Sequence, residues 1–124
     1  YAQAGVSPEV MGLGPVPAIA KALEKGALSL KDMSCLELNE AFAAQSLGVL
    51  KQLSSQHDVD QEWLLERTNI NGGAIALGHP LGASGSRILV SLIYELERQQ
   101  QDLGLASLCI GGGMGTAVII RRCK

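Results

Sequence analysis

The stretch GLASLCIGGGMGTAVIIRR, from Gly104 to Arg122, contains two apolar runs rich in strand-forming residues, with three consecutive glycines between them. Two such runs joined by a short glycine-rich segment are typical of a β-hairpin. Glycine suits the connection because it adopts positive φ angles without steric cost. The stretch therefore predicts two neighbouring strands that run antiparallel.

Helical periodicity marks the segments that precede this hairpin. The segment Val10–Gly26 predicts a helix that begins near Pro15, and Asn39–Leu53 predicts a second helix directly after a strand. A short helix is predicted after Asp60, which is a suitable N-cap. The segment Ser86–Gln100 predicts a long amphipathic helix. Its expected apolar face comprises Ile88, Leu89, Leu92, Ile93 and Leu96.

Three further strands are predicted upstream, at Tyr1–Gly5, Ser34–Leu38 and Asn69–Asn71. With the hairpin, the expected order is βαβαβαββ. Alternation of this kind is typical of an α/β fold with a largely parallel sheet. We therefore expect one α/β domain with a mixed five-stranded sheet, an antiparallel last strand and helices on both faces.

The composition of the 124 residues fits a folded domain, because 47% are hydrophobic and the mean hydropathy is +0.20. The net charge of −2, with basic residues dispersed along the chain, argues against binding to nucleic acid. No apolar run approaches the roughly 20 residues that cross a bilayer. The first residues also lack the pattern of a signal peptide. We therefore predict a cytoplasmic protein that binds neither nucleic acid nor membranes.

The cysteines and histidines do not form a metal or disulfide pattern. Cys35, Cys109 and Cys123 are an odd number without a CxxC pair, and the only histidines are His57 and His79. These spacings favour neither a disulfide framework nor a zinc site. We expect free thiols and no bound metal, with Cys35 as a core residue of an apolar strand.

The stretch NGGAIALGHPLGASGSR, from Asn71 to Arg87, surrounds His79 with five glycines and follows it with Pro80. This composition predicts a shaped loop in which at least one glycine has a positive φ angle. A single histidine in such a loop either caps a turn or takes part in chemistry. The rest of the sequence has to distinguish these two interpretations.

Three polar or reactive side chains follow predicted strands. Asn39, His79 and Cys109 all lie at strand ends or in the next loop, and ligands in open α/β sheets bind at the carboxyl ends of strands. A thiol can exchange protons near neutral pH, and an imidazole can activate a thiol. Main-chain N–H groups of Gly111–Gly113 could face a reacting carbonyl oxygen. Together these residues predict thiol-dependent carbonyl chemistry.

Four motifs in this order and spacing resemble the C-terminal domain of the thiolase family, and specifically its acetyl-CoA acetyltransferase branch. They are VMGLGPVPA at 10–18, NEAFA at 39–43, GGAIALGHPLGASGSR at 72–87 and CIGGGMGTA at 109–117. The resemblance covers residues 1–124 apart from a divergent segment at 57–67. It implies a single thiolase C-terminal domain.

The resemblance implies a role for each matching residue. His79 would activate a nucleophilic cysteine and bind the thioester oxygen, and Asn39 would hold a water in the same oxyanion hole. Cys109 would be the acid and base that deprotonates the second acetyl-CoA. The amide of Gly111 would belong to a second oxyanion hole.

The implied reaction is the condensation of two acetyl-CoA molecules to acetoacetyl-CoA and CoA, with thiolysis as its reverse. The substrates are CoA thioesters, and no cofactor or metal is expected to be bound. Met11 and Phe42 match family positions near the acyl group and the pantetheine arm, or pack as ordinary apolar residues. Met11 favours the short-chain type.

The family carries its nucleophilic cysteine on an N-terminal domain and most of the CoA site on a loop domain, and this sequence resembles neither. The resemblance therefore implies that the 124 residues are inactive alone and act with that missing N-terminal half of the same protein. The complete protein is expected to be a dimer or tetramer. The isolated half is expected to expose a large apolar face.

Other functions remain open from the sequence. Within the family, the alternatives are a degradative 3-ketoacyl-CoA thiolase and a non-catalytic interaction module. Outside it, a phosphate-binding loop is disfavoured because GHPLGASGSR lacks the Walker lysine. A serine hydrolase that uses Ser84 is disfavoured because G-A-S-G-S lacks the last glycine of a nucleophile elbow.

Overall fold

The computed structural model of the chain describes residues 1–123. Within this range the strands are β1 (Ala2–Gly5), β2 (Cys35–Leu38), β3 (Leu103–Cys109) and β4 (Met114–Arg121). The α-helices are α1 (Pro15–Gly26), α2 (Ala43–His57), α3 (Gln61–Arg67), α4 (Ala74–Leu77) and α5 (Ser84–Arg98). Two 3-10 helices are η1 (Pro8–Leu13) and η2 (Leu30–Asp32). None of the helices in the described range is long and apolar enough to cross a membrane.

The predicted hairpin is the centre of the sheet. Over residues 1–123 the strand order is β1-β4-β3-β2, and β4 pairs antiparallel with both β1 and β3. Strand β2 pairs parallel with β3. The turn closes with a hydrogen bond from the Met114 N–H to the Gly111 carbonyl oxygen at 2.9 Å, and Gly111 has a φ of 86°. The sequence prediction of a glycine-dependent hairpin is therefore confirmed.

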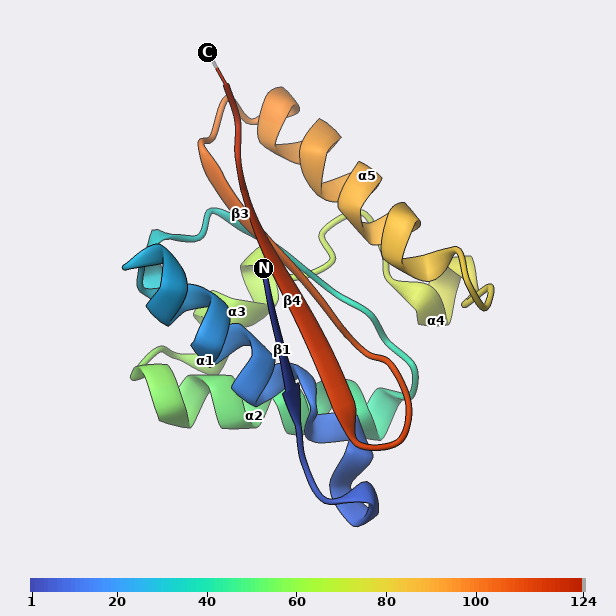
Figure 1. Cartoon of the computed structure of the whole chain (residues 1–124). Coiled ribbons are helices and arrows are strands. Elements are labelled where there is room, and N and C mark those ends of the chain that lie inside the picture. The colour runs from blue at the N-terminus through green and yellow to red at the C-terminus, as the bar shows by residue number, and fades with distance from the viewer. Residues whose placement is uncertain (124) are drawn as a thin grey trace.

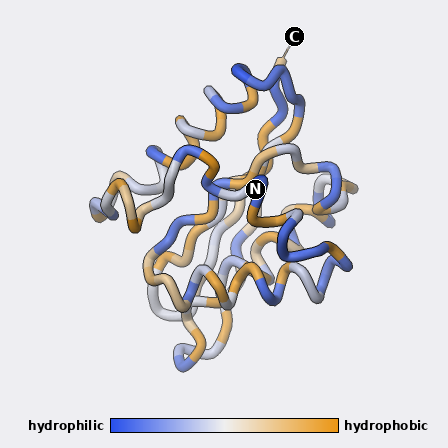
Figure 2. The backbone as a smooth tube through the Cα atoms, turned by 180° about the vertical axis from the view of Figure 1, so that it is seen from behind, coloured by the Kyte–Doolittle hydropathy of each residue, from blue (hydrophilic) through white to orange (hydrophobic). Residues whose placement is uncertain are grey.

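Helices cover both faces of this sheet, as predicted. Helix α1 packs on β1 and β4 on one side, with α2 behind it, and α5 packs on β2 and β3 on the other side (Figure 1). Successive side chains of a strand point to opposite faces, so Leu105 joins the α1 cluster and Ala106 joins the α5 cluster. The helices carry alternating hydrophilic and hydrophobic segments, as amphipathic helices do (Figure 2).

The predicted fifth strand at Asn69–Asn71 is wrong. The chain makes a single parallel bridge between Thr68 and Leu36, and then Asn69 takes a left-handed conformation with φ of 51°. Beyond this bridge, the Asn69 side chain, and not a strand backbone, makes the hydrogen bonds to Leu38 of β2. Its Oδ1 accepts from the Leu38 N–H at 2.9 Å, and its Nδ2 donates to the Leu38 carbonyl at 2.7 Å. An amide side chain therefore takes the place of a strand at the edge of β2.

Three local predictions also need correction. Helix α2 begins at Ala43 rather than at Asn39, because Phe42 is still extended with φ of −147°. The glycine loop contains the short helix α4, which the sequence analysis did not predict. Ile93 of α5 is 48% exposed instead of lying on the buried face with Ile88 and Leu92. Cys35 is buried against α5, as expected of a core thiol.

Helix α1 lies unusually close to the hairpin. A Cβ atom on Gly115 of β4 would collide with the backbone carbonyl of Gly14, and one on Gly14 would lie 2.7 Å from the backbone of Met114. Two glycines are therefore needed where the helix entrance crosses the strand. This crossing holds η1, which precedes α1, beside the turn that follows Cys109.

Candidate active site

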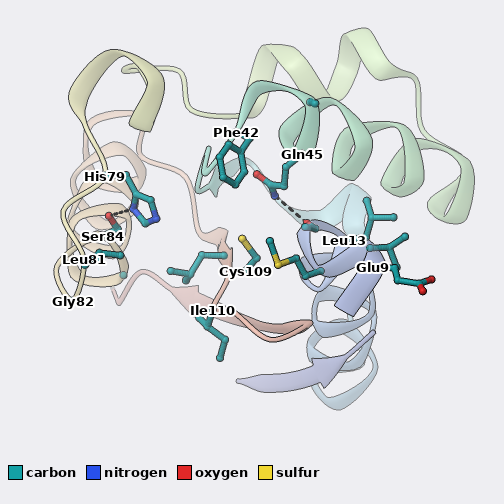
Figure 3. A pocket seen from close by; sticks show the side chains of 17 residues that line it. Glu9, Leu13, Phe42, Gln45, His79, Leu81, Gly82, Ser84, Cys109 and Ile110 are labelled. Atoms are coloured by element: carbon teal, nitrogen blue, oxygen red, sulfur yellow. Dashed lines mark hydrogen bonds between the residues drawn. The ribbon is translucent and has the colours of Figure 1, made fainter. Parts of the chain in front are cut away.

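A cavity of about 870 Å³ opens at the carboxyl ends of β2 and β3 (Figure 3). These parallel strands end at the same edge of the sheet, so the loops that follow them meet there. The cavity wall is mainly apolar and is formed by η1, the start of α2, the loop into α5 and the hairpin turn. Residues that line it include Met11, Leu13, Phe42, Gln45, His79, Leu81, Ser84, Cys109, Ile110 and Gly111.

Cys109 is the last residue of β3, and its side chain faces the cavity (Figure 3). It is half-buried, and burial raises the pKa of its thiol, an effect that a backbone hydrogen bond only partly offsets. The thiol is therefore protonated at neutral pH. Gly111, which follows in the turn, lines the same cavity. A proton donor and a glycine amide thus lie on one wall.

His79 lines the cavity from the glycine loop. The loop turns at Gly78, which has a φ of 94°, and Gly72 and Gly82 also have positive φ angles. This outcome confirms the predicted use of glycine. Ring atom Nδ1 lies 2.6 Å from the Ser84 hydroxyl oxygen, on the side of the ring away from the cavity (Figure 3). His79 and Cys109 therefore line the same cavity.

Asn39 is near the site but does not line the cavity. Its backbone N–H donates to the Ser107 carbonyl at 2.9 Å, which places it at the carboxyl end of β2, beside β3. The residue is 2% exposed, and neither of its side-chain amide atoms has a hydrogen-bond partner in residues 1–123. An amide that is buried in this way can bind a small polar group.

Met11 and Phe42 are exposed by 48% and 66%, and both line the cavity. The interpretation of these two residues as ordinary packed apolar residues is therefore wrong for the described chain. Sequence reasoning missed Gln45 as a lining residue. Its Nε2 donates to the Gly12 carbonyl at 3.1 Å and ties α2 to η1. Its position within the NEAFAAQ run, on the first turn of α2, could have indicated it.

A carboxylate connects the two loops that follow β2 and precede α5. Glu40 accepts hydrogen bonds from the Ile75 N–H at 3.0 Å and from the Asn69 side chain at 3.2 Å. It also fills the space that a Cβ on Gly73 would need. These contacts fix the chain around Asn39 relative to the loop that carries His79. Sequence reasoning did not identify this role.

The cavity contains a thiol, an imidazole and nearby amides, without an acidic cluster. The described part of the chain holds no group of three or more histidine, cysteine or acidic side chains placed to bind a metal ion. Such a site is suited to proton transfer and to the stabilisation of a developing oxyanion.

Comparisons with known proteins show which family the chain belongs to. Residues 1–122 match the family described as "Thiolase, C-terminal domain". The chain is 55% identical over 122 residues to an acetyl-CoA acetyltransferase of Syntrophomonas wolfei, with 97% of this chain and 29% of the relative covered. It is 53% identical to the cytosolic acetyl-CoA acetyltransferase of Mus musculus, with 98% and 29% covered.

Two solved structures are similar over nearly the whole chain. One is the acetyl-CoA acetyltransferase of Bacillus anthracis, with a TM-score of 0.85, 51% identity and coverage of 97% of this chain and 28% of that one. The other is human mitochondrial 3-ketoacyl-CoA thiolase in complex with CoA, with a TM-score of 0.88, 52% identity and coverage of 99% and 29%. The chain thus spans less than a third of the length of these relatives. On the family match and these similarities, the chain belongs to the thiolase family and corresponds to its C-terminal domain.

Proposed function

We propose that this chain is the C-terminal catalytic half of an acetyl-CoA acetyltransferase, which condenses two acetyl-CoA molecules to acetoacetyl-CoA and CoA and catalyses the reverse thiolysis. The observation that carries the proposal is the presence of His79 and Cys109 on the wall of one apolar cavity. The relatives named acetyl-CoA acetyltransferase support the choice of substrate.

His79 acts in the first half of the reaction. Its ring accepts the proton of a nucleophilic cysteine from an N-terminal domain, and the thiolate attacks the thioester carbonyl of the first acetyl-CoA. The protonated ring then donates a hydrogen bond to the oxyanion. The C–S bond to CoA breaks, and the CoA thiolate leaves as the acyl-enzyme forms.

Cys109 acts in the second half. Its thiol first gives its proton to the departing CoA thiolate, and the Cys109 thiolate that remains takes a proton from the methyl group of the second acetyl-CoA. The resulting carbanion attacks the acyl-enzyme, whose C–S bond breaks, and the released cysteine thiolate takes back the proton held by His79. The raised pKa of the thiol supports this role, because a weakly acidic thiol corresponds to a strongly basic thiolate. The Gly111 amide stabilises an oxyanion, and the buried amide of Asn39 holds a water in the hole next to His79.

Met11 and Phe42 contact the acyl group and the pantetheine arm at the rim of the cavity. The substrates are CoA thioesters, and the reaction needs no metal or bound cofactor. Residues 1–124 act as one domain together with an N-terminal half, in a dimer or tetramer. The proposed location is the cytoplasm, as the name of the mouse relative states for that protein.

The test compares substitutions in the protein at its natural length. Cys109→Ser should lower the condensation rate by about 100-fold or more, the usual contribution of a general base, while acyl-enzyme formation continues. His79→Ala should impair both steps. Acyl-enzyme is measured by intact mass, and condensation by the release of CoA. The control is Cys123→Ser, which makes the same change at an exposed thiol and should leave both steps unchanged.

Four outcomes would contradict the proposal. Condensation by the Cys109→Ser variant at the wild-type rate would show that the Cys109 thiol is not the base of this step. Turnover by residues 1–124 alone would mean that the nucleophile lies within them. A higher kcat/KM for long 3-ketoacyl-CoA than for acetoacetyl-CoA would favour a degradative thiolase instead. Absence of both acylation and turnover in the protein at its natural length would favour a non-catalytic interaction module.

A further inference from the structure

Ser84 contacts the imidazole of His79 and has no other assigned role. It is the first residue of α5, is only 3% exposed and is one of the residues that line the cavity. Its Oγ lies 2.6 Å from His79 Nδ1 and donates to the Pro80 carbonyl oxygen at 3.2 Å. The hydroxyl therefore connects the ring to the backbone directly after it.

The number of hydrogens in this contact limits the state of the ring. A serine hydroxyl has one hydrogen to donate and can also accept. When that hydrogen is directed to the Pro80 carbonyl, the short contact to His79 requires the ring to donate its Nδ1–H to Ser84. A neutral imidazole has a hydrogen on one nitrogen only, so Nε2 then carries a free electron pair.

The hydroxyl is not needed to close the turn in which it lies. The Pro80 carbonyl already accepts the backbone N–H groups of Ala83 at 3.1 Å and of Ser84 at 3.2 Å. These bonds are made by the main chain and would persist with alanine at position 84. The turn therefore does not require the side-chain hydroxyl to fold, and the contact that this hydroxyl adds is the one with His79.

We propose that Ser84 is a positioning residue that fixes His79 as the Nδ1–H tautomer and turns the electron pair of Nε2 toward the cavity. This inference rests on the proposed function for its chemical consequence. With Nε2 unprotonated, the ring can accept a thiol proton. Once charged, it still donates Nδ1–H to Ser84 and gains an Nε2–H donor for the oxyanion.

The decisive measurement is the tautomer of His79, which does not depend on activity. The protein at its natural length is labelled with 15N-histidine, and His79 is assigned by its loss in His79→Gln. Two-bond 1H–15N correlations then show which ring nitrogen is protonated at a pH where the ring is neutral. We expect Nδ1–H in the wild type. If the neutral ring in the wild type carries its hydrogen on Nε2 instead, this result alone overturns the proposal.

Substitutions test whether Ser84 causes this state. Ser84→Ala should shift the ring toward the Nε2–H tautomer, which free imidazole side chains favour in water, and Ser84→Thr should retain Nδ1–H because it keeps the hydroxyl. Ser86→Ala, the same change at an exposed position two residues further along α5, should have no effect. Retention of Nδ1–H in Ser84→Ala would overturn the proposal.

Acyl-enzyme formation gives the functional consequence. Ser84→Ala should slow it about tenfold with KM unchanged, the loss expected for one hydrogen bond of ordinary net strength, and Ser84→Thr should recover most of the rate. A rate in Ser84→Ala equal to the wild type would overturn the positioning role. If the tautomer changes as expected but the wild type forms no acyl-enzyme, the proposed function fails and the assignment of the tautomer stands.

Discussion

Glu37 is a carboxylic acid in the middle of strand β2, on the face of the sheet that α5 covers. It is 2% exposed, and its nearest opposite charge is Arg87, whose Nη1 lies 3.9 Å from Oε2. Burial raises the pKa of Glu37 to about 7, against the attraction of Arg87 and with a smaller contribution from Glu40 and Glu95. The side chain is therefore half protonated near neutral pH.

This shift has a defined effect on stability. Because the folded-state pKa lies above the usual value of 4.5, the folded protein binds more protons than the unfolded chain between pH 4.5 and about 7. The contribution of Glu37 to the free energy of unfolding therefore falls as pH rises through this range. The slope is at most about 1.4 kcal/mol per pH unit.

Glu37→Gln should remove this dependence. We expect it to raise the free energy of unfolding at pH 8 by about 2 kcal/mol, since a neutral amide avoids the burial of a charge, and to change it little at pH 5. Urea unfolding at both pH values measures the difference. Glu97→Gln, at an exposed position on α5, is the control. Equal effects of Glu37→Gln at the two pH values would contradict the prediction.

At the scale of the elements, the crossing of α1 over the hairpin positions one wall of the cavity. Gly14 ends η1 and caps α1, and Gly115 follows the first residue of β4. Their backbones are in direct contact, so Met11 on η1 and Gly111 in the turn face the same cavity. Packing between these two elements therefore determines both stability and the shape of the site.

Gly115→Ala should destabilise the protein by about 3 kcal/mol or more, because the added methyl group overlaps the backbone of Gly14 and lies 2.6 Å from the Pro15 nitrogen. The matched control is Gly85→Ala, in α5, where a Cβ meets no atom within 4 Å. That substitution should stabilise by up to about 1 kcal/mol through helix propensity. Thermal unfolding of the two variants provides the measurement. A neutral Gly115→Ala would show that α1 can move away from the strand.

At the scale of the whole molecule, α5 is apolar on two sides. Ile88, Leu92 and Leu96 are buried against the sheet, while Val90, Ile93 and Tyr94 are exposed by 52%, 48% and 67%. The exposed residues follow one another at helical spacing and form a continuous stripe. The chain covers only 29% of its relatives' length, and an exposed stripe of this kind favours association.

Residues 1–124 expressed alone should therefore self-associate, with an average mass above the 13.0 kDa of the chain. Substitution of Val90 and Ile93 by lysine should shift the population toward the monomer, because two charges on the stripe oppose burial. Light scattering after size exclusion measures the mass. The control is Leu47→Lys, at a leucine on α2 that is 65% exposed. An unmodified chain that is monomeric at every concentration would contradict the prediction.

The sequence by itself determined the features that depend on neighbouring residues. The hairpin around Gly111–Gly113, the long helix α5 and the glycine turns of the histidine loop follow from local patterns of glycine and apolar residues. The pattern also placed Cys109 at the carboxyl end of β3, beside the end of β2, since parallel strands end together. His79 reaches the same cavity from the loop between α4 and α5 and not from a strand end, so its position came from tertiary packing. The resemblance of four motifs to one family added the identity of the domain.

Only the tertiary structure decided the features that depend on residues far apart in the chain. Asn69 replaces a fifth strand because its side chain pairs with Leu38, 31 residues away, and no local pattern contains that contact. The burial of Glu37 depends on α5, which begins 47 residues later in the sequence. Hydrogen bonds and desolvation act through space, so their effect on an ionisable or strand-like residue appears only after the elements have packed.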